Sequence, residues 1–194
     1  MKIEGNYDLK KKDLSILIDN KNKCKSLKIK PLENFYDVCI FNSITSLDLD
    51  VTIDGYLNSK HEWQKKFYIR SISLILNEHL DKIHALMSSH FYNFILSSQI
   101  FNSIKDEILS YRTTYKELNR KKQSLSKIRN ELIAHRSKDA EQFIESLDNI
   151  NVDDLFNLAI ETQTLLNQFT QLTDKILEQI IINFDQFYKE MKSK

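Results

Sequence analysis

The sequence predicts an all-α protein, built as an antiparallel helical bundle. Only two Gly and one Pro occur in 194 residues, so the residues that form tight turns are nearly absent. Apolar residues recur at intervals of three or four over long stretches, which is the period of an amphipathic helix. The length fits one domain with a hydrophobic core better than two.

The N-terminal part gives weaker signals. Residues 1–34 are rich in lysine and have only scattered apolar positions, of which residues 14–18 fit either a short helix or a short strand. Residues 35–53 are apolar with several β-branched side chains, which disfavour a helix. We expect residues 1–54 to be an N-terminal basic arm and variable segment, either a solvated tail or an arm that touches nucleic acid. Residues 55–194 are expected to form the helical domain.

Two helix starts have recognisable caps. Ser59 and Glu62 have the spacing of a capping box, in which each side chain satisfies a backbone amide, and the helix after them is predicted to reach about Met87. Asn151 is followed by acidic residues in the next turn, which is typical of an N-cap. This last helix is predicted to run for about 40 residues to Met191, with one apolar face buried against the bundle or a partner.

The segment between these helices is predicted to be helical too. Apolar residues step by three or four from about Phe91 to Leu132, with room for a break. The pattern has one longer gap, between Leu118 and Leu125, where four polar residues are expected to form a loop between antiparallel helices. Residues 139–142 fit the start of a further short helix.

Charge is unevenly distributed, although the formal net charge is only +1. Residues 112–138 contain nine Lys or Arg and two acids, whereas residues 139–174 contain eight acids and no Lys or Arg. Two solvated helix faces of opposite sign would explain this split. A basic field that attracts a polyanion would explain it equally well.

Several kinds of function have no support in the sequence. The two cysteines form neither a disulfide framework nor a CxxC zinc pair, and the histidines lack metal-ligand spacing. We expect four of them at the surface or the core edge: His61, His79, His84 and His90. The N-terminus has no apolar leader, and no apolar run could cross a membrane. A cytoplasmic protein with no membrane contact, metal or cofactor is expected.

The strongest chemical signal is Arg129-Asn130, followed after four residues by His135. Arginine offers a permanent charge and a fork of donors that suits phosphate, and histidine exchanges protons near neutral pH. Together they are the minimum equipment for cleaving a phosphodiester without a metal. The alternative is structural, because a histidine at a helix C-terminus stabilises the helix dipole while Arg129 and Arg136 remain solvated.

This motif resembles the signature of the HEPN superfamily, a group of small α-helical domains with an Arg, a polar residue (often Asn), four variable residues and a His. The resemblance implies a metal-independent ribonuclease, typically of a toxin, abortive-infection or antiviral system. It also implies that Arg129 and His135 are the catalytic pair and that Asn130 is the polar position. Toxins of nucleotidyltransferase-paired systems have a Tyr where this chain has Ser137, so regulation through that Tyr is not expected.

Helix geometry supports the homodimer that the resemblance also implies. Six residues separate Arg129 from His135, which is about 9 Å along a helix axis and about 120° around it. Cleavage through the ribose 2′-OH needs a base, an acid and positive charge at the phosphorus. Two motifs that face each other across a two-fold axis would supply all three in one composite site.

Further residues are candidates for supporting roles. Lys127, Arg136 and Lys138 are expected to contact the RNA backbone. Arg70 and Glu78 lie eight residues apart near one helix face, where they would orient the catalytic pair or be ordinary surface charges.

Two other functions fit the same sequence. The chain could be a non-catalytic helical scaffold or nucleic-acid-binding protein whose last helix binds a partner through its apolar face. Alternatively it is the toxin of a pair, neutralised by an antitoxin or another defence-system protein. Substitution of Arg129 and His135 separates the enzyme from the scaffold.

Overall fold

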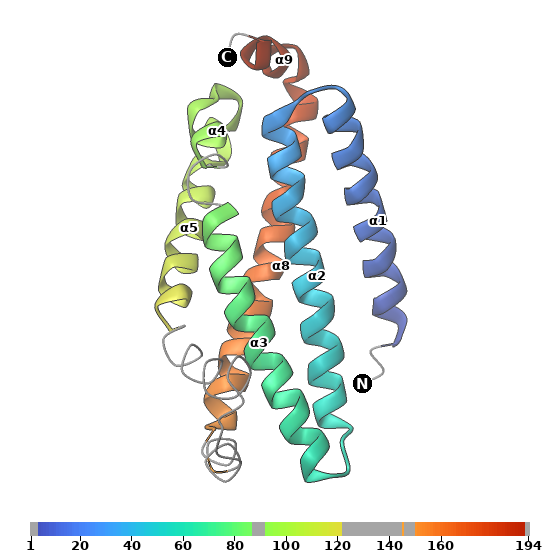
Figure 1. The fold of residues 1–194 in the computed structure, drawn as a ribbon. Helices are drawn as coiled ribbons and strands as arrows, with labels where there is room; N and C mark the ends of the chain where they lie inside the picture. Colours follow the sequence, from blue (N-terminus) through green and yellow to red (C-terminus); the bar gives the residue numbers. More distant parts are fainter. Residues whose placement is uncertain (1–3, 87–91, 122–144, 146–149, 193–194) are drawn as a thin grey trace.

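The computed structural model describes residues 4–86, 92–121, 145 and 150–192, and every element in these residues is helical. Five helices run roughly along one long axis (Figure 1): α1 (Glu4–Ser26), α2 (Lys30–Leu57), α3 (Glu62–Leu86), α5 (Lys105–Arg120) and α8 (Val152–Ile182). Three shorter elements are α4 (Tyr92–Ser97), the 3-10 helix η2 (Gln99–Ile104) and α9 (Phe184–Lys192). The predicted all-α bundle is confirmed, and the two-fold dimer stays a prediction.

Helix α8 is the centre of the arrangement. It packs against α2, α3, α5 and η2, while α1 packs on α2, and α2 packs on α3. Figure 1 shows that successive long helices alternate in direction and that α1 and α5 lie on opposite sides of the bundle. Burial along α8 follows the predicted apolar pattern, from Leu155 and Leu158 to Ile176 and Ile180.

The length predicted for the last helix is wrong. Helix α8 has 31 residues and ends at Ile182, and α9 begins at Phe184. Asn183 separates them, because its side-chain amide and its backbone N–H both donate to the carbonyl of Gln179, and asparagine often ends helices in this way. The break lets Phe187 reach the core, where its ring centroid lies 6.0 Å from that of Phe94.

The N-terminal segment is neither a solvated tail nor a detached arm in the part that the structure describes. Residues 14–18 lie within a helix of 23 residues, and residues 35–53 lie within α2. Two lysines of α1 contact α2. Lys10 pairs with Asp50 and donates to the hydroxyl of Ser46 at 2.9 Å, and the ammonium of Lys21 lies 2.5 Å from a carboxylate oxygen of Asp37.

Helix α2 differs from the sequence predictions in two further respects. The division expected between residues 54 and 55 falls inside this helix. Asn42, Thr45 and Ser46 place polar groups on its buried side, which the apolar pattern of the segment did not predict.

One predicted cap is confirmed and the other is wrong. The side-chain oxygen of Asn151 accepts a hydrogen bond from the N–H of Asp154 at 3.2 Å, so Asn151 is the N-cap of α8. The hydroxyl of Ser59 instead donates to the carbonyl of Gly55 at 2.6 Å, at the end of α2. Helix α3 begins at Glu62, whose carboxylate pairs with Lys65. Ser59 therefore ends one helix and does not start the next.

His79 is a core residue, contrary to the expected surface or core-edge position, because its side chain is 2% exposed. Its Nδ1 lies 3.2 Å from the hydroxyl oxygen of Thr45, and its ring stacks on Phe41 at 5.7 Å between centroids. The Thr45 hydroxyl itself donates to the carbonyl of Phe41, so it accepts the Nδ1 proton. Burial lowers the pKa of His79 from 6.5 to about 4, because the charged ring would lose its hydration.

The buried imidazole predicts a pH-dependent stability. The folded pKa lies below the unfolded one, so the folded state binds fewer protons between pH 6.5 and about 4, and stability falls as the pH falls through this window. Urea unfolding at pH 7 and pH 5 should show a loss of about 2 kcal/mol from this group. His79→Gln should remove that part of the pH dependence, and His61→Gln, at an exposed histidine, should keep it. Equal pH dependence in all three proteins would contradict the prediction.

Gly55 allows α2 and α3 to approach each other. A Cβ at this position would lie 2.4 Å from ring atoms of Tyr68, which is far inside van der Waals contact. We predict that Gly55→Ala lowers the free energy of unfolding by about 1–3 kcal/mol, although alanine favours a helix by about 1 kcal/mol. The other glycine, Gly5, lies in the first turn of α1 and is the control. Thermal unfolding measures both changes, and a higher midpoint for Gly55→Ala would refute the close approach.

Candidate functional site

The predicted catalytic and RNA-binding residues lie outside the residues that the structure describes. These are Arg129, Asn130 and His135, together with Lys127, Arg136 and Lys138. Their roles therefore stay predictions. The structure does describe the helices that flank this segment in the chain, and these helices limit where it begins and ends.

Both flanks of the motif segment are held at the same end of the bundle. Helix α5 ends at Arg120 and α8 starts at Val152, and Figure 1 shows both ends in the lower half of the bundle, with the start of α8 below the end of α5. The ammonium of Lys121 lies 2.6 and 2.7 Å from the carboxylate oxygens of Glu161, on α8. The side chain of Ile150, just before the N-cap of α8, is buried. The chain therefore leaves from, and returns to, a defined place on the bundle.

The two weaker candidates, Arg70 and Glu78, both lie on α3. The Nε of Arg70 donates to the carbonyl of Lys66 at 3.4 Å, one turn earlier. Glu78 is exposed, and its carboxylate lies 3.9 Å from the ammonium of Lys82, one turn later. The structure thus gives Glu78 the position of a surface charge, while an orienting role of either residue stays a prediction.

Among the buried hydrogen-bond acceptors that sequence analysis missed, three belong to α3 and α5. The hydroxyl oxygen of Ser73 and the amide oxygens of Asn77 and Asn119 are buried and have no hydrogen-bond partner. Tyr115 donates from α5 to the carbonyl of Leu80 on α3 at 3.0 Å. Because α3 and α5 run in opposite directions, Asn119 and Asn77, each about one turn from that bond, lie at a similar level of the bundle.

Unpaired acceptors in a low-dielectric interior cost free energy until a donor reaches them. Asn119 lies in the last turn of α5, from which the chain continues to the motif segment, and Asn77 lies at a similar level. A guanidinium or an ordered water could donate to them. The sequence held one signal: Ser73 and Asn77 occur within the buried spacing of Ile69, Ile72, Leu76 and Leu80.

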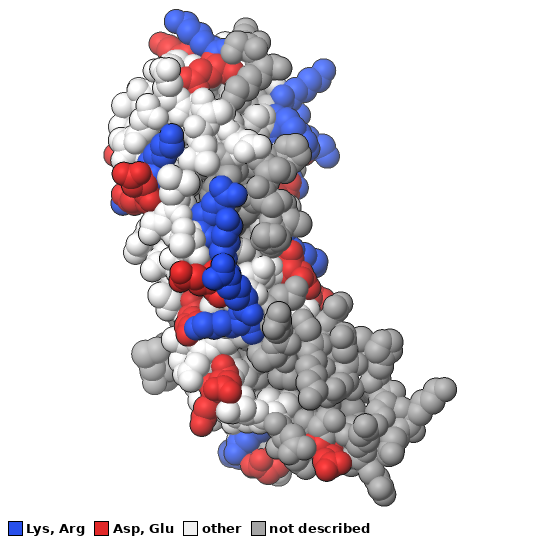
Figure 2. All heavy atoms as spheres, turned by 90° about the vertical axis from the view of Figure 1, so that its left-hand side faces the viewer, with Lys and Arg blue, Asp and Glu red and all other residues white. Residues whose placement is uncertain are grey.

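The outer face of α5 is basic. Figure 2 shows the side of the molecule on which α4 and α5 lie, and several Lys and Arg side chains adjoin one another across its middle, with Asp and Glu side chains beside them. On α5 we call the following residues the α5 stripe: Lys105, Arg112, Lys116 and Arg120. Its opposite face is apolar, with Tyr111 and Tyr115 among the buried side chains. The basic region predicted from residue 112 onward thus begins on a helix whose position is fixed.

A separate cleft of about 590 Å³ lies between α1, α2 and α8. Cys39 lines it, and burial raises the pKa of this thiol to about 12, so the thiol remains protonated and unreactive near neutral pH. Asn42 also lines the cleft, but both polar atoms of its amide are buried without a hydrogen-bond partner. Helix α1 lines this cleft and lies on the opposite side of the bundle from α5. The cleft is therefore distinct from the place where the motif segment attaches.

The described residues contain no cluster of three or more His, Cys, Asp or Glu side chains that could hold a metal ion. Across the same part of the chain, no helix combines the length and the apolar character needed to cross a membrane.

Comparison with protein families matches residues 71–177 to the AbiU2 family model, HEPN_AbiU2. The matched region is more than half of the chain, starts within α3 and ends within α8. Neither curated proteins nor solved structures gave a match. Helices α1 and α2 lie outside the matched region, so they add a layer to the part that the family model covers. The resemblance to HEPN domains is confirmed, and the chain belongs to the AbiU2 family of the HEPN superfamily.

Proposed function

We propose that this protein is a metal-independent endoribonuclease of the HEPN type that acts in toxin or antiviral defence in the cytoplasm. One observation carries the proposal: the family match over residues 71–177 contains the whole Arg129-Asn130-x4-His135 motif. The motif thus occurs within the correct type of domain, and a chance occurrence elsewhere in the chain would not do so.

The chemistry follows from the groups in the motif. A histidine removes the proton of the ribose 2′-OH, and the 2′-oxygen attacks the phosphorus while the bond to the 5′-oxygen breaks. A second histidine protonates the departing 5′-oxygen. Arg129 stabilises the charge on the phosphorane, and Asn130 holds the scissile phosphate. The products are a 2′,3′-cyclic phosphate and a 5′-OH.

Two copies of the chain would complete this site. One His135 acts as the base and the other as the acid, so both proton transfers occur within one cleft. The attachment of both flanks to α5 and α8 supports the proposal, because a composite site needs each motif to be presented from a rigid end of its own bundle.

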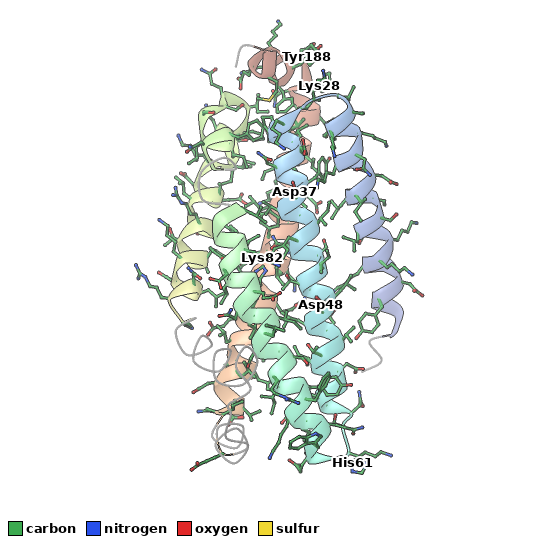
Figure 3. The ribbon with its side chains drawn as sticks, viewed as in Figure 1. Lys28, Asp37, Asp48, His61, Lys82 and Tyr188 are labelled. Atoms are coloured by element: carbon green, nitrogen blue, oxygen red, sulfur yellow. The ribbon has the colours of Figure 1, made fainter. Side chains whose placement is uncertain are left out.

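A second candidate function is a scaffold, and one surface favours it. Apolar side chains at the end of α8 and in α9 are exposed, with exposed fractions of 75% for Ile181, 66% for Ile182 and 58% for Phe184. Tyr188 stacks on Phe184 at 6.2 Å and lies at the end of the bundle (Figure 3). A partner, such as an antitoxin, would cover these side chains. The apolar face of α8 proposed for this role is unsuitable, because Leu165 and Leu172 are buried within the chain.

The activity can be tested with purified protein, total RNA and tRNA in the presence of EDTA. We predict cleavage to cyclic-phosphate and 5′-OH ends, because no step requires a metal. The double variant Arg129→Ala/His135→Ala should be slower by about 100-fold or more, since general acid–base catalysis alone contributes about 10²–10⁴.

His61→Ala, at an exposed histidine, is the matched control and should cleave at the rate of the natural protein. Cleavage that EDTA abolishes, or that the double variant retains, would refute the proposed mechanism. Absence of cleavage by all three proteins, together with loss of a bound partner on Phe184→Asp, would favour the scaffold.

A further inference from the structure

The α5 stripe separates its positive charges from the acids of the same helix. At 100° per residue, Lys105, Arg112, Lys116 and Arg120 fall within about 80° of the helix circumference and span about 22 Å of its length. The acids of α5 are Asp106, Glu107 and Glu117, and all three fall outside this sector. A helix with randomly mixed charges would not present one sign along its whole outer edge.

Helix α8 neutralises one acid of α5 and leaves three of the four cations of the stripe exposed. Lys175 of α8 lies 2.6 Å from the carboxylate of Glu107, so this acid is paired on the side that faces α8. Lys121 pairs with Glu161 and likewise points toward α8. Lys105, Lys116 and Arg120 are exposed, and none of the three forms an ion pair with a described residue. Three cations of the α5 stripe are therefore available to an external anion.

The α5 stripe ends where the chain continues to the motif segment. Its Arg120 end is the end of α5 from which the chain continues to the motif segment. Arg129 is nine residues further on, so the chain allows at most about 30 Å between the two Cα atoms. The motif is therefore tethered within that distance of the Arg120 end of the stripe.

We propose that the α5 stripe binds the phosphate backbone of the RNA substrate and guides the strand to the motif. This inference rests on the proposed ribonuclease function and adds a substrate-binding surface to it. The stripe contacts phosphates and not base edges, so it contributes affinity without sequence preference.

The test measures RNA binding separately from cleavage. In the Arg129→Ala/His135→Ala background, Lys105→Gln, Lys116→Gln and Arg120→Gln are combined, and Arg112 is kept because it has another interaction in the structure. Fluorescence anisotropy with a labelled single-stranded 20-mer RNA is followed from 50 to 300 mM KCl. The triple substitution should weaken binding at least 10-fold at 50 mM KCl. It should also reduce the slope of log Kd against log salt by about 2, since each phosphate contact on a single strand contributes about 0.7.

A matched control removes the same charge elsewhere. Lys11→Gln/Lys12→Gln/Lys25→Gln changes three exposed lysines of α1, and circular dichroism checks that both triple variants fold. Weaker binding and a smaller salt slope only for the α5 variant support the proposal. An equal loss of RNA affinity in both variants overturns the proposal. Unchanged RNA binding by the α5 variant also overturns it, whether or not that variant loses a bound acidic protein.

The same variants distinguish this inference from the proposed function. If the natural protein cleaves RNA and the triple substitution, made with Arg129 and His135 retained, cleaves it equally well at low enzyme concentration, the stripe proposal is wrong and the ribonuclease stands. If RNA binding depends on the stripe but no cleavage occurs, the surface is confirmed and the catalytic proposal fails.

Discussion

Burial of the apolar face of α8 is the interaction on which the other helices depend. Phe169 is 1% exposed and packs on Tyr111 of α5 at 5.5 Å between ring centroids, and Ile176 is completely buried. Each large side chain buried in this way contributes about 1.5–3 kcal/mol, whereas an isolated helix gains little from propensity alone. Because α8 contacts α2, α3, α5 and η2, its apolar face determines where each of these elements lies. It thereby fixes the end of α5 and both attachment points of the motif segment.

The core built around this apolar face contains polar side chains. His79, Ser73 and Asn77 lie on the buried side of α3, and two of these have acceptors without a partner. Apolar residues of similar size would stabilise a bundle at least as well. Polar groups that break the pattern of a core often mark the place where function constrains the sequence. Here they occur on the helix where the family match begins, and also on α2, outside that match, where Asn42, Thr45 and Ser46 are buried.

The sequence predicted the features that depend on local pattern and failed where distant contacts decide. The spacing from Leu155 to Ile180 was enough to predict the buried face of α8, and Asn151 was enough to predict its start. The end of α8 was missed, because the apolar pattern continues into α9 and gives no sign of the backbone break at Asn183. The position of α1 was missed because Asp50 and Asp37, the partners of its lysines, lie on another helix. The motif was found from residue types alone, but its geometry lies beyond the described residues.

The charge split along the chain has a structural explanation that joins the two interpretations left open by the sequence. Lys121 of the basic segment pairs with Glu161 of the acidic segment, and Lys175–Glu107, outside both segments, is a second pair between α8 and α5. Such exposed pairs contribute little stability, but they consume the charges on the inner edges of both helices. Lys105, Lys116 and Arg120 remain exposed on the outer edge of α5, with Asp106 and Glu117 exposed outside their sector. Opposite charges on neighbouring helices thus leave a basic surface outside the bundle, although the net charge of the whole chain is close to zero.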